Sequence, residues 1–201
     1  MISVIIPYKE DRGWLDKAIE SVEKQTYKNY EIILSQSDNR VGYNLNRGIE
    51  KAKGDYIKYL CDDDLLTPNS LMDSLKGIKY FDFIHGNAIN FFPNGRQSIQ
   101  RPIKRHFECR ELLRRNYIHG GTLMYKSEVF EKYGLFDESL WTGEEYDFNL
   151  KILKGGARIG YVNSTLYLYR RHELQKSIGN MDGEYQAKRQ LQIQEIKSRY
   201  V

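Results

Sequence analysis

The sequence predicts an α/β fold in which a mostly parallel central sheet is flanked by helices and carries a small antiparallel subsheet. The first 60 residues alternate between short β-branched runs and segments with helical spacing of apolar residues, a pattern that favours parallel strands joined by right-handed crossovers. Later strand-like runs are short, and the pair Asn94 and Gly95 between them is typical of a β-hairpin. The 201 residues, with 40% hydrophobic and 29% charged side chains, are enough for one well-packed domain.

Three strands and two helices are expected in the first 60 residues. The strands are predicted at residues 2–6, 30–34 and 55–60. Pro7 is expected to end the first strand, because proline has no N–H for a ladder hydrogen bond. The buried faces of the two helices are predicted to contain Trp14, Leu15, Ala18, Ile19 and Val22, and Leu45, Ile49 and Ala52. Gly54 is expected to end the second helix.

The rest of the chain is expected to add shorter elements. Helices are predicted from Thr67 and Pro68 through residue 78, at 107–116, at 127–133 before Gly134, and from residue 144. Strands are predicted at residues 81–85, 88–92, 120–125 and 166–169. Residues 182–201 are predicted to form a polar, basic helix. A solvated helix is the favoured interpretation, and the alternatives are weak packing back onto the domain, contact with a partner, or contact with a membrane surface.

Three consecutive carboxylates, Asp62, Asp63 and Asp64, follow the third predicted strand. In such sheets ligands bind beyond the carboxyl ends of the strands, where the loops at 7–10 and 35–38 are also expected. Adjacent carboxylates repel one another, so they require a cation or hydrogen-bond donors nearby. Carboxylate oxygens suit magnesium or manganese, which can bridge them to a diphosphate. The alternative is a solvated turn that caps the following helix, but the convergence of three strand ends favours a site.

Composition limits the partners and the compartment. The net charge of +4 is too small to indicate nucleic acid, and it fits an anionic ligand or a membrane surface equally well. Cys61 and Cys109 lack CxxC spacing, which favours buried thiols in a reducing, cytoplasmic compartment. The first residues are expected to form a strand rather than a signal peptide. No apolar run approaches 18 residues, so any membrane contact is expected to be peripheral, through the C-terminal helix.

Six motifs, in order and spacing, resemble the inverting family 2 glycosyltransferases of the GT-A fold. They are residues 3–8, 47–57, 60–64, 133–138, 143–147 and 169–172. The resemblance runs from residue 2 to about residue 177. It implies a domain at 1–177, divided into a nucleotide-binding half at 1–78 and an acceptor half at 79–177, followed by the C-terminal helix at 178–201.

In this family the acidic motif binds a divalent metal ion, here Mn²⁺ or Mg²⁺, and the nucleotide sugar. The resemblance places Asp63 as the main metal ligand and Asp62 at a position that contacts the ribose. Taking the triplet literally as Asp-x-Asp assigns Asp62 and Asp64 instead, so Asp64 stays a candidate ligand. His172 matches a position that supplies a further metal ligand in several members.

Pro7, Tyr8 and Glu10 match the first nucleotide-binding loop of the family. Tyr8 is a candidate to stack on the base, and the alternative for it is packing against the first helix. A nucleoside diphosphate sugar is therefore the expected donor, with a UDP-sugar favoured.

Three departures from the family pattern affect this donor site. Ser35 stands where many members carry an Asp that recognises uracil, and Asp38 follows three residues later. Cys61 stands where the first Asp of the acidic motif is usual. Leu45 replaces an arginine that often precedes the Asn at Asn46, which weakens the expected pyrophosphate contacts from that helix.

The catalytic base of the family is the second acid of a pair that falls here on Glu144 and Glu145. Inverting transfer needs a carboxylate that accepts the proton of the attacking hydroxyl, and the resemblance gives this role to Glu145. Glu144 is expected to hold a hydroxyl of the donor or acceptor, and Asp147 to orient the helix start. The alternative is that these acids only favour the helix dipole.

The sequence therefore predicts a metal-dependent inverting, hexosyltransferase-like glycosyltransferase that moves a sugar to a hydroxyl of a carbohydrate or glycosylated acceptor, in glycan or polysaccharide synthesis. The departures at Ser35, Leu45 and Cys61 leave open a degenerate module that binds sugar nucleotides without transfer. A nucleotidyltransferase is a weaker alternative, because residues 8–11 lack the glycine-rich, basic phosphate loop expected of that class.

Overall fold

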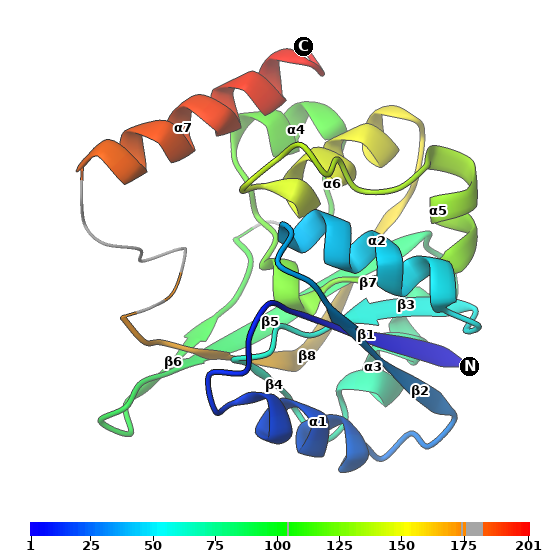
Figure 1. Ribbon diagram of the computed structural model, residues 1–201. Coiled ribbons are helices and arrows are strands. Elements are labelled where there is room, and N and C mark those ends of the chain that lie inside the picture. Colours follow the sequence, from blue (N-terminus) through cyan, green and yellow to red (C-terminus); the bar gives the residue numbers. More distant parts are fainter. Residues whose placement is uncertain (104, 174, 176–182) are drawn as a thin grey trace.

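A mixed sheet of eight strands runs through the computed structural model, which describes residues 1–103, 105–173, 175 and 183–201 (Figure 1). The strand order is β2-β1-β3-β7-β5-β8-β4, and β6 pairs with β5 outside this path. The strands are β1 Ile2–Tyr8, β2 Tyr30–Gln36, β3 Tyr56–Tyr59, β4 Leu65–Leu66, β5 Phe83–Phe91, β6 Gln97–Gln100, β7 Met124–Lys126 and β8 Ile159–Arg170. The predicted α/β class is confirmed.

The parallel part of the sheet contains β1 between β2 and β3, as the alternating pattern predicts. Pro7 does not end β1, which continues to Tyr8 and pairs Pro7 with Ser35. Ile5 accepts a hydrogen bond from the N–H of Leu60 on the β3 side, so Pro7, two residues later, also faces that side. The β1–β3 register ends at Ile5 and Tyr59, so the missing N–H of Pro7 costs no ladder bond.

Helices cover both faces of the sheet. They are α1 Leu15–Glu23, α2 Val41–Lys51, α3 Ser70–Ile78, α4 Cys109–Arg114, α5 Ser127–Tyr133, α6 Glu144–Lys154 and α7 Gly183–Ser198. Residues of α1 and α3 pack with Ile2, Val4 and Ile6 of β1, whereas residues of α2, α4, α5 and α6 pack with Ile5 in a second core cluster. This division follows the alternation of side chains along a strand, and Figure 1 shows the two layers below and above the sheet.

The structure corrects three expectations in the second half of the chain. Residues 83–91 form one strand with a register irregularity around Gly86 and Asn87, rather than two separate strands. The predicted strand at 120–125 is a 3₁₀ turn, Gly120–Thr122, followed by β7. The predicted strand at 166–169 is the end of the longer β8, against which β4 pairs in antiparallel register. The expected domain boundary at 177/178 lies outside the described residues, and α7 begins at Gly183.

Candidate active site

A cleft of about 850 Å³ opens where β1 and β3 end, facing the start of α6 and one side of α7. Most of the predicted site residues line it: Pro7, Tyr8, Glu10, Asp62, Asp63, Asp64, Glu144 and Glu145. These side chains come from three segments that are distant in sequence: the end of β1 with the loop after it, the turn after β3, and the first turn of α6. The sequence predicts a site at the carboxyl ends of these strands, and the structure has a concave, acidic surface at that place.

Asp63 lies at the centre of the polar contacts in this cleft. Its Oδ2 is 3.0 Å from Nε2 of His172 and 3.4 Å from Nη2 of Arg12. The same arginine nitrogen is 3.6 Å from Oδ2 of Asp62. Burial raises the pKa of Asp62, and the charge of Asp63 raises it further, while Arg12 opposes both effects. The two acids thus hold excess negative charge that already attracts a guanidinium.

Asp64 has a different environment from its neighbour. The hydroxyl of Tyr167 donates to its Oδ2 at 2.8 Å, and the backbone N–H of Arg170 donates to its Oδ1 at 2.7 Å. The side chain is buried, and burial followed by the charge of Asp63 raises the pKa of this carboxyl well above its usual range. Asp64 therefore joins the turn to β8.

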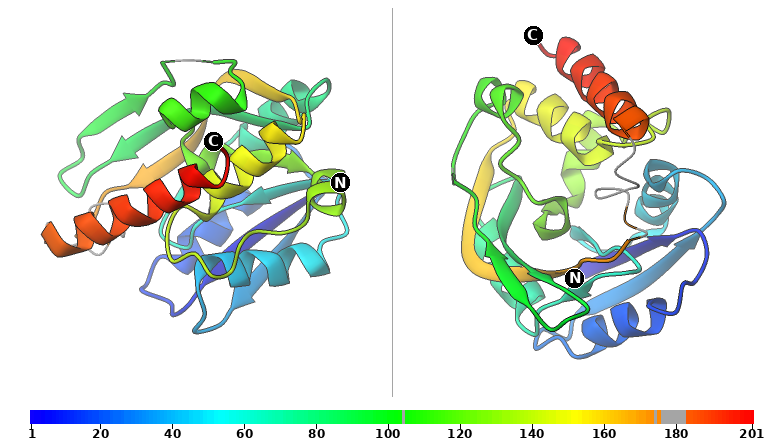
Figure 2. Two further views of the ribbon diagram at one scale, coloured as in Figure 1. Left: turned by 90° about the horizontal axis from the view of Figure 1, so that it is seen from above. Right: turned by 90° about the vertical axis from the view of Figure 1, so that its left-hand side faces the viewer.

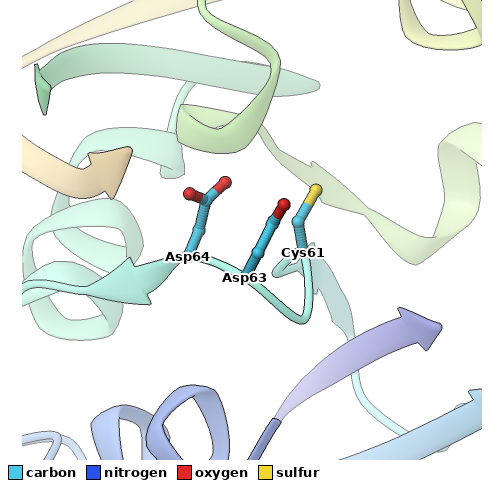
Figure 3. A group of neighbouring side chains, drawn as sticks. All are labelled: Cys61, Asp63 and Asp64. Atoms are coloured by element: carbon cyan, nitrogen blue, oxygen red, sulfur yellow. The ribbon is translucent and has the colours of Figure 1, made fainter. Parts of the chain in front are cut away.

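Cys61, Asp63 and Asp64 present ligand atoms within 4.8 Å of one another, and their side chains rise together from the turn (Figure 3). The carboxylate oxygens fit a hard divalent cation, whereas the soft, half-buried thiol of Cys61 does not. The residues that would hold an ion are therefore Asp63, with His172 beside it and the acids that flank it. The position of Arg12 supports this fit, because it shows where positive charge is attracted.

His172 does not line the cleft, but its Nε2 contacts the carboxylate of Asp63. Its ring lies 4.4 Å from that of Trp14, and its backbone N–H donates to Oε1 of Gln175 at 3.3 Å. Trp14 in turn contacts the guanidinium groups of Arg12 and Arg170, 5.5 and 5.6 Å from the ring centroid. The end of β8 and the start of α1 therefore fix the imidazole that faces Asp63.

Glu145 lies in the first turn of α6, whose N-cap is Gly143 with a φ of 79°. A Cβ atom on Gly120 would lie 2.8 Å from Oε1 of Glu145 and 2.8 Å from the hydroxyl oxygen of Tyr59. Burial, followed by the charge of Glu145, raises the pKa of Tyr59 well above its usual range. Only glycine at 120 leaves room for this arrangement of carboxylate and phenol.

Lys58 holds the backbone next to Gly120 in place, a role that was not predicted from the sequence. Its fully buried ammonium donates to the carbonyl oxygens of Gly121 at 2.6 Å and Leu123 at 3.0 Å. Burial lowers the pKa of Lys58 to about 7. The sequence signal that could have revealed this role is a lysine within a strand, β3, whose other residues are aromatic or aliphatic. Lys58 fixes the backbone beside Gly120 and therefore the surroundings of Glu145.

Besides His172, three predicted residues do not line the cleft. Ser35 is buried in β2, and Asp38 is exposed near Lys9, with 3.9 Å between its Oδ1 and the lysine Nζ. Asn46 forms hydrogen bonds with the backbone of Phe136 in both directions, at 3.0 Å each. Asn46 thus connects α2 to the loop before α6.

Two further residues of the cleft were not assigned a role from the sequence. His119 lies against Tyr167 and Tyr169, and burial lowers its pKa to about 4. Arg171 follows β8, and its buried Nε has no hydrogen-bond partner among the described residues. Arg12 and Arg171 place positive charge near the acidic turn, in a site where Leu45 replaces the expected arginine.

The fold defines the class of the protein: it has the GT-A glycosyltransferase fold, with a cleft at the carboxyl ends of β1 and β3. The structure of S. aureus TarS in complex with UDP-GlcNAc is similar, with a TM-score of 0.70 and 18% identity over 86% of this chain and 59% of that one. The complex of TarS with UDP gives a TM-score of 0.69 at 18% identity, over 85% of this chain and 60% of that one. The predicted GT-A fold is confirmed.

Curated relatives carry the name glycosyltransferase. An uncharacterized glycosyltransferase of Rickettsia typhi is 30% identical, over an alignment that covers 77% of this chain and 59% of the relative. One of Rickettsia conorii is 30% identical, over an alignment that covers 92% of this chain and 36% of the relative. No protein-family model matches the sequence. The chain spans between one third and two thirds of the length of these relatives. The predicted resemblance to glycosyltransferases is confirmed.

Proposed function

We propose that this chain is a metal-dependent inverting glycosyltransferase that moves a sugar from a nucleoside diphosphate sugar to an acceptor hydroxyl, in glycan or polysaccharide synthesis. The observation that carries the proposal is the single cleft that contains both Asp63, which contacts His172 and Arg12, and Glu145. Asp63 can hold a cation beside a diphosphate, and Glu145 can accept a proton.

In the proposed reaction Glu145 accepts the proton of the acceptor hydroxyl while that oxygen attacks the anomeric carbon. The bond from the anomeric carbon to the diphosphate breaks, and its electron pair leaves with the diphosphate, so the configuration inverts. A divalent ion, Mn²⁺ or Mg²⁺, held by Asp63 would offset the charge of the leaving diphosphate. Arg12, whose Nη2 lies 3.4 Å from Oδ2 of Asp63, adds positive charge from the protein at this position.

UDP-sugars are the favoured donors in this proposal. Support comes from TarS, whose structures contain UDP-GlcNAc and UDP, and from Tyr8, an aromatic side chain available for stacking in the cleft. Ser35 lies outside the cleft lining, so the base would be recognised by the loop after β1 and the start of α2, where Asn39 and Asn44 line the cleft.

A thermal-shift panel of nucleoside diphosphates with and without Mn²⁺ tests the donor site. We expect UDP to raise Tm only when Mn²⁺ is present, because ligands that bind the folded state stabilise it. Glu145→Gln is then assayed for sugar transfer: it should keep the UDP-dependent shift and lose activity. Near-normal transfer by Glu145→Gln would refute its role as base.

The structure also contains an observation that favours a binding module without transfer. Arg12 lies between Asp62 and Asp63, where it neutralises part of the charge that would attract a metal ion. A protein that binds UDP with Mn²⁺ but neither transfers nor hydrolyses the sugar over a panel of acceptors would support this alternative.

A further inference from the structure

The C-terminal helix α7 presents one face to the active-site cleft. Arg189, Ile193 and Lys197 are spaced by four residues and therefore share a side of the helix, and all three line the cleft. The sequence favours a solvated helix for this segment, whereas α7 lies beside α6 in the structure, as both views of Figure 2 show. This helix thus forms a wall of the cleft opposite the sheet.

Several specific contacts hold α7 in this position. Oε1 of Gln192 accepts hydrogen bonds from the backbone N–H groups of Trp141 at 3.0 Å and Thr142 at 3.3 Å. A Cβ atom on Gly143 would lie 2.9 and 3.0 Å from the Cδ1 atoms of Ile193 and Ile196, so the helix packs closely on the N-cap of α6.

The last residues of the helix and those after it are anchored to the same region. Nη1 of Arg199 lies 2.8 Å from Oδ2 of Asp137 and 3.3 Å from Oδ1 of Asp147, and the hydroxyl of Tyr200 donates to Asp147 at 3.0 Å. These bonds attach the end of the chain to α6, the helix that carries Glu145. The orientation of Arg189 and Lys197 toward the cleft therefore follows from the packing of the whole helix.

Arg189 and Lys197 are half-buried cations that form no salt bridge with any acid in the described part of the chain. Neighbouring cations are paired: Lys188 of α7 lies 2.8 Å from Glu184, and Arg199, which follows α7, contacts three acids. A cation held in a concave wall without a protein counter-charge raises the local concentration of anions and favours their binding.

The donor does not account for these two cations. Its diphosphate is expected beside Asp63, where Arg12 already supplies positive charge. Arg189 and Lys197 instead come from the helix that packs on the start of α6, and hence lie on the side of Glu144 and Glu145. In the proposed function this is the side from which the acceptor hydroxyl approaches.

We infer that the acceptor carries an anionic group, a phosphate or a carboxylate, that Arg189 and Lys197 bind while its hydroxyl faces Glu145. This inference rests on the proposed function and adds the chemical class of the acceptor. Charge-assisted hydrogen bonds from a guanidinium and an ammonium to an oxyanion are about twice as strong as neutral ones, which makes the pair a determinant of acceptor choice.

The test compares a sugar phosphate with its neutral parent sugar. Glucose 6-phosphate and glucose are titrated by NMR into the full chain with Mn²⁺ and saturating UDP, which fills the donor site. We expect wild type to bind glucose 6-phosphate about 10-fold more tightly than glucose. The double variant Arg189→Gln, Lys197→Gln should bind both sugars equally. The control Lys24→Gln, Lys188→Gln removes two exposed, salt-bridged lysines and should keep the preference.

The outcomes separate this inference from the proposed function. If wild type fails to bind UDP, the proposed function falls, and the inference falls with it. If UDP binds but wild type shows no preference for glucose 6-phosphate, or if the double variant keeps the preference, only the inference is refuted. The UDP-induced Tm shift of each variant shows that it is folded, and the single variants Arg189→Gln and Lys197→Gln provide the comparison should the double variant lack that shift.

Discussion

The hydroxyl of Tyr167 donates a hydrogen bond of 2.8 Å to the carboxylate of Asp64, across a separation of 103 residues in the sequence. The other oxygen of Asp64 accepts from the N–H of Arg170, so both oxygens are engaged by β8. Asp63, one residue earlier, instead directs its carboxylate to His172 and Arg12. We expect the two acids to have different roles, Asp64 in stability and Asp63 in metal binding.

Alanine at position 64 should therefore destabilise the fold. Asp64→Ala would leave the buried Tyr167 hydroxyl and the Arg170 N–H without their acceptor, at a cost of about 2–4 kcal/mol in the free energy of unfolding. Asp63→Asn should change that free energy by less than about 1 kcal/mol and weaken Mn²⁺ binding about 10-fold or more. Urea denaturation and isothermal titration with Mn²⁺ measure the two effects. Unchanged Mn²⁺ affinity in Asp63→Asn would show that Asp63 is not the main ligand.

Gly120 should be essential for catalysis although it carries no functional group. In Gly120→Ala the new methyl group would lie 2.8 Å from Oε1 of Glu145, which forces the carboxylate to move. Because a misplacement of about 1 Å can cost about 100-fold in rate, we expect kcat to fall about 10- to 100-fold while the affinity for UDP stays the same. Steady-state kinetics and UDP titration provide the measurements.

The matched control for this substitution is Gly183→Ala, since a Cβ atom there meets no atom of the described residues within 4 Å. It should leave kcat unchanged. A Gly120→Ala enzyme with wild-type kcat would mean that the observed position of Glu145 is not the one used in the reaction.

The sequence predicted the first third of the fold, from β1 to β3, well because its signals there are local. The β-branched runs, the helical spacing at Leu15, Ala18 and Val22, and the acids after β3 each report on a few neighbouring residues, and the parallel topology brings the strand ends together. Pro7 was misjudged because the cost of its missing N–H depends on where the neighbouring strand ends, which is a property of the sheet.

The features that were missed depend on contacts between distant segments. Lys58 is tolerated in the core because two carbonyl groups about 65 residues away accept its hydrogen bonds, at 2.6 and 3.0 Å. The α7 helix is polar over most of its surface, and only its contacts with α6 and with the loop after Phe136 make it part of the cleft. Spacing within one segment carries no information about such partners.

Arg12 should compete with the metal ion for the acidic pair. Its guanidinium lies 3.4 Å from Oδ2 of Asp63 and 3.6 Å from Oδ2 of Asp62, so Arg12→Gln removes a repulsive charge from the metal site. We expect Mn²⁺ to bind about 3- to 10-fold more tightly without UDP, as a partly exposed charge contributes about 1 kcal/mol. UDP should bind more weakly, because a cation near the diphosphate is lost. Lys9→Gln, which removes an exposed cation near Asp38, is the control and should not tighten Mn²⁺ binding.

His85 should make the fold sensitive to acid. Its ring is buried between Phe107 and Tyr161, its Nε2 lies 2.9 Å from the carbonyl oxygen of Arg105, and its Nδ1 has no partner among the described residues. Burial lowers the pKa of His85 to about 4, since the charged ring would leave a second N–H without an acceptor.

The sign of the effect follows from proton binding in the two states. An unfolded histidine takes up its proton near pH 6.5, whereas folded His85 does so only near pH 4, so between these values the unfolded state binds more protons and stability falls as the pH falls. From pH 7 to pH 5 this contributes a loss of about 2 kcal/mol in the free energy of unfolding. Urea denaturation at both pH values should show that His85→Gln is less sensitive to acid by that amount. His106→Gln, which removes an exposed imidazole, should retain the wild-type sensitivity. Equal losses in wild type and His85→Gln would exclude His85 as the source.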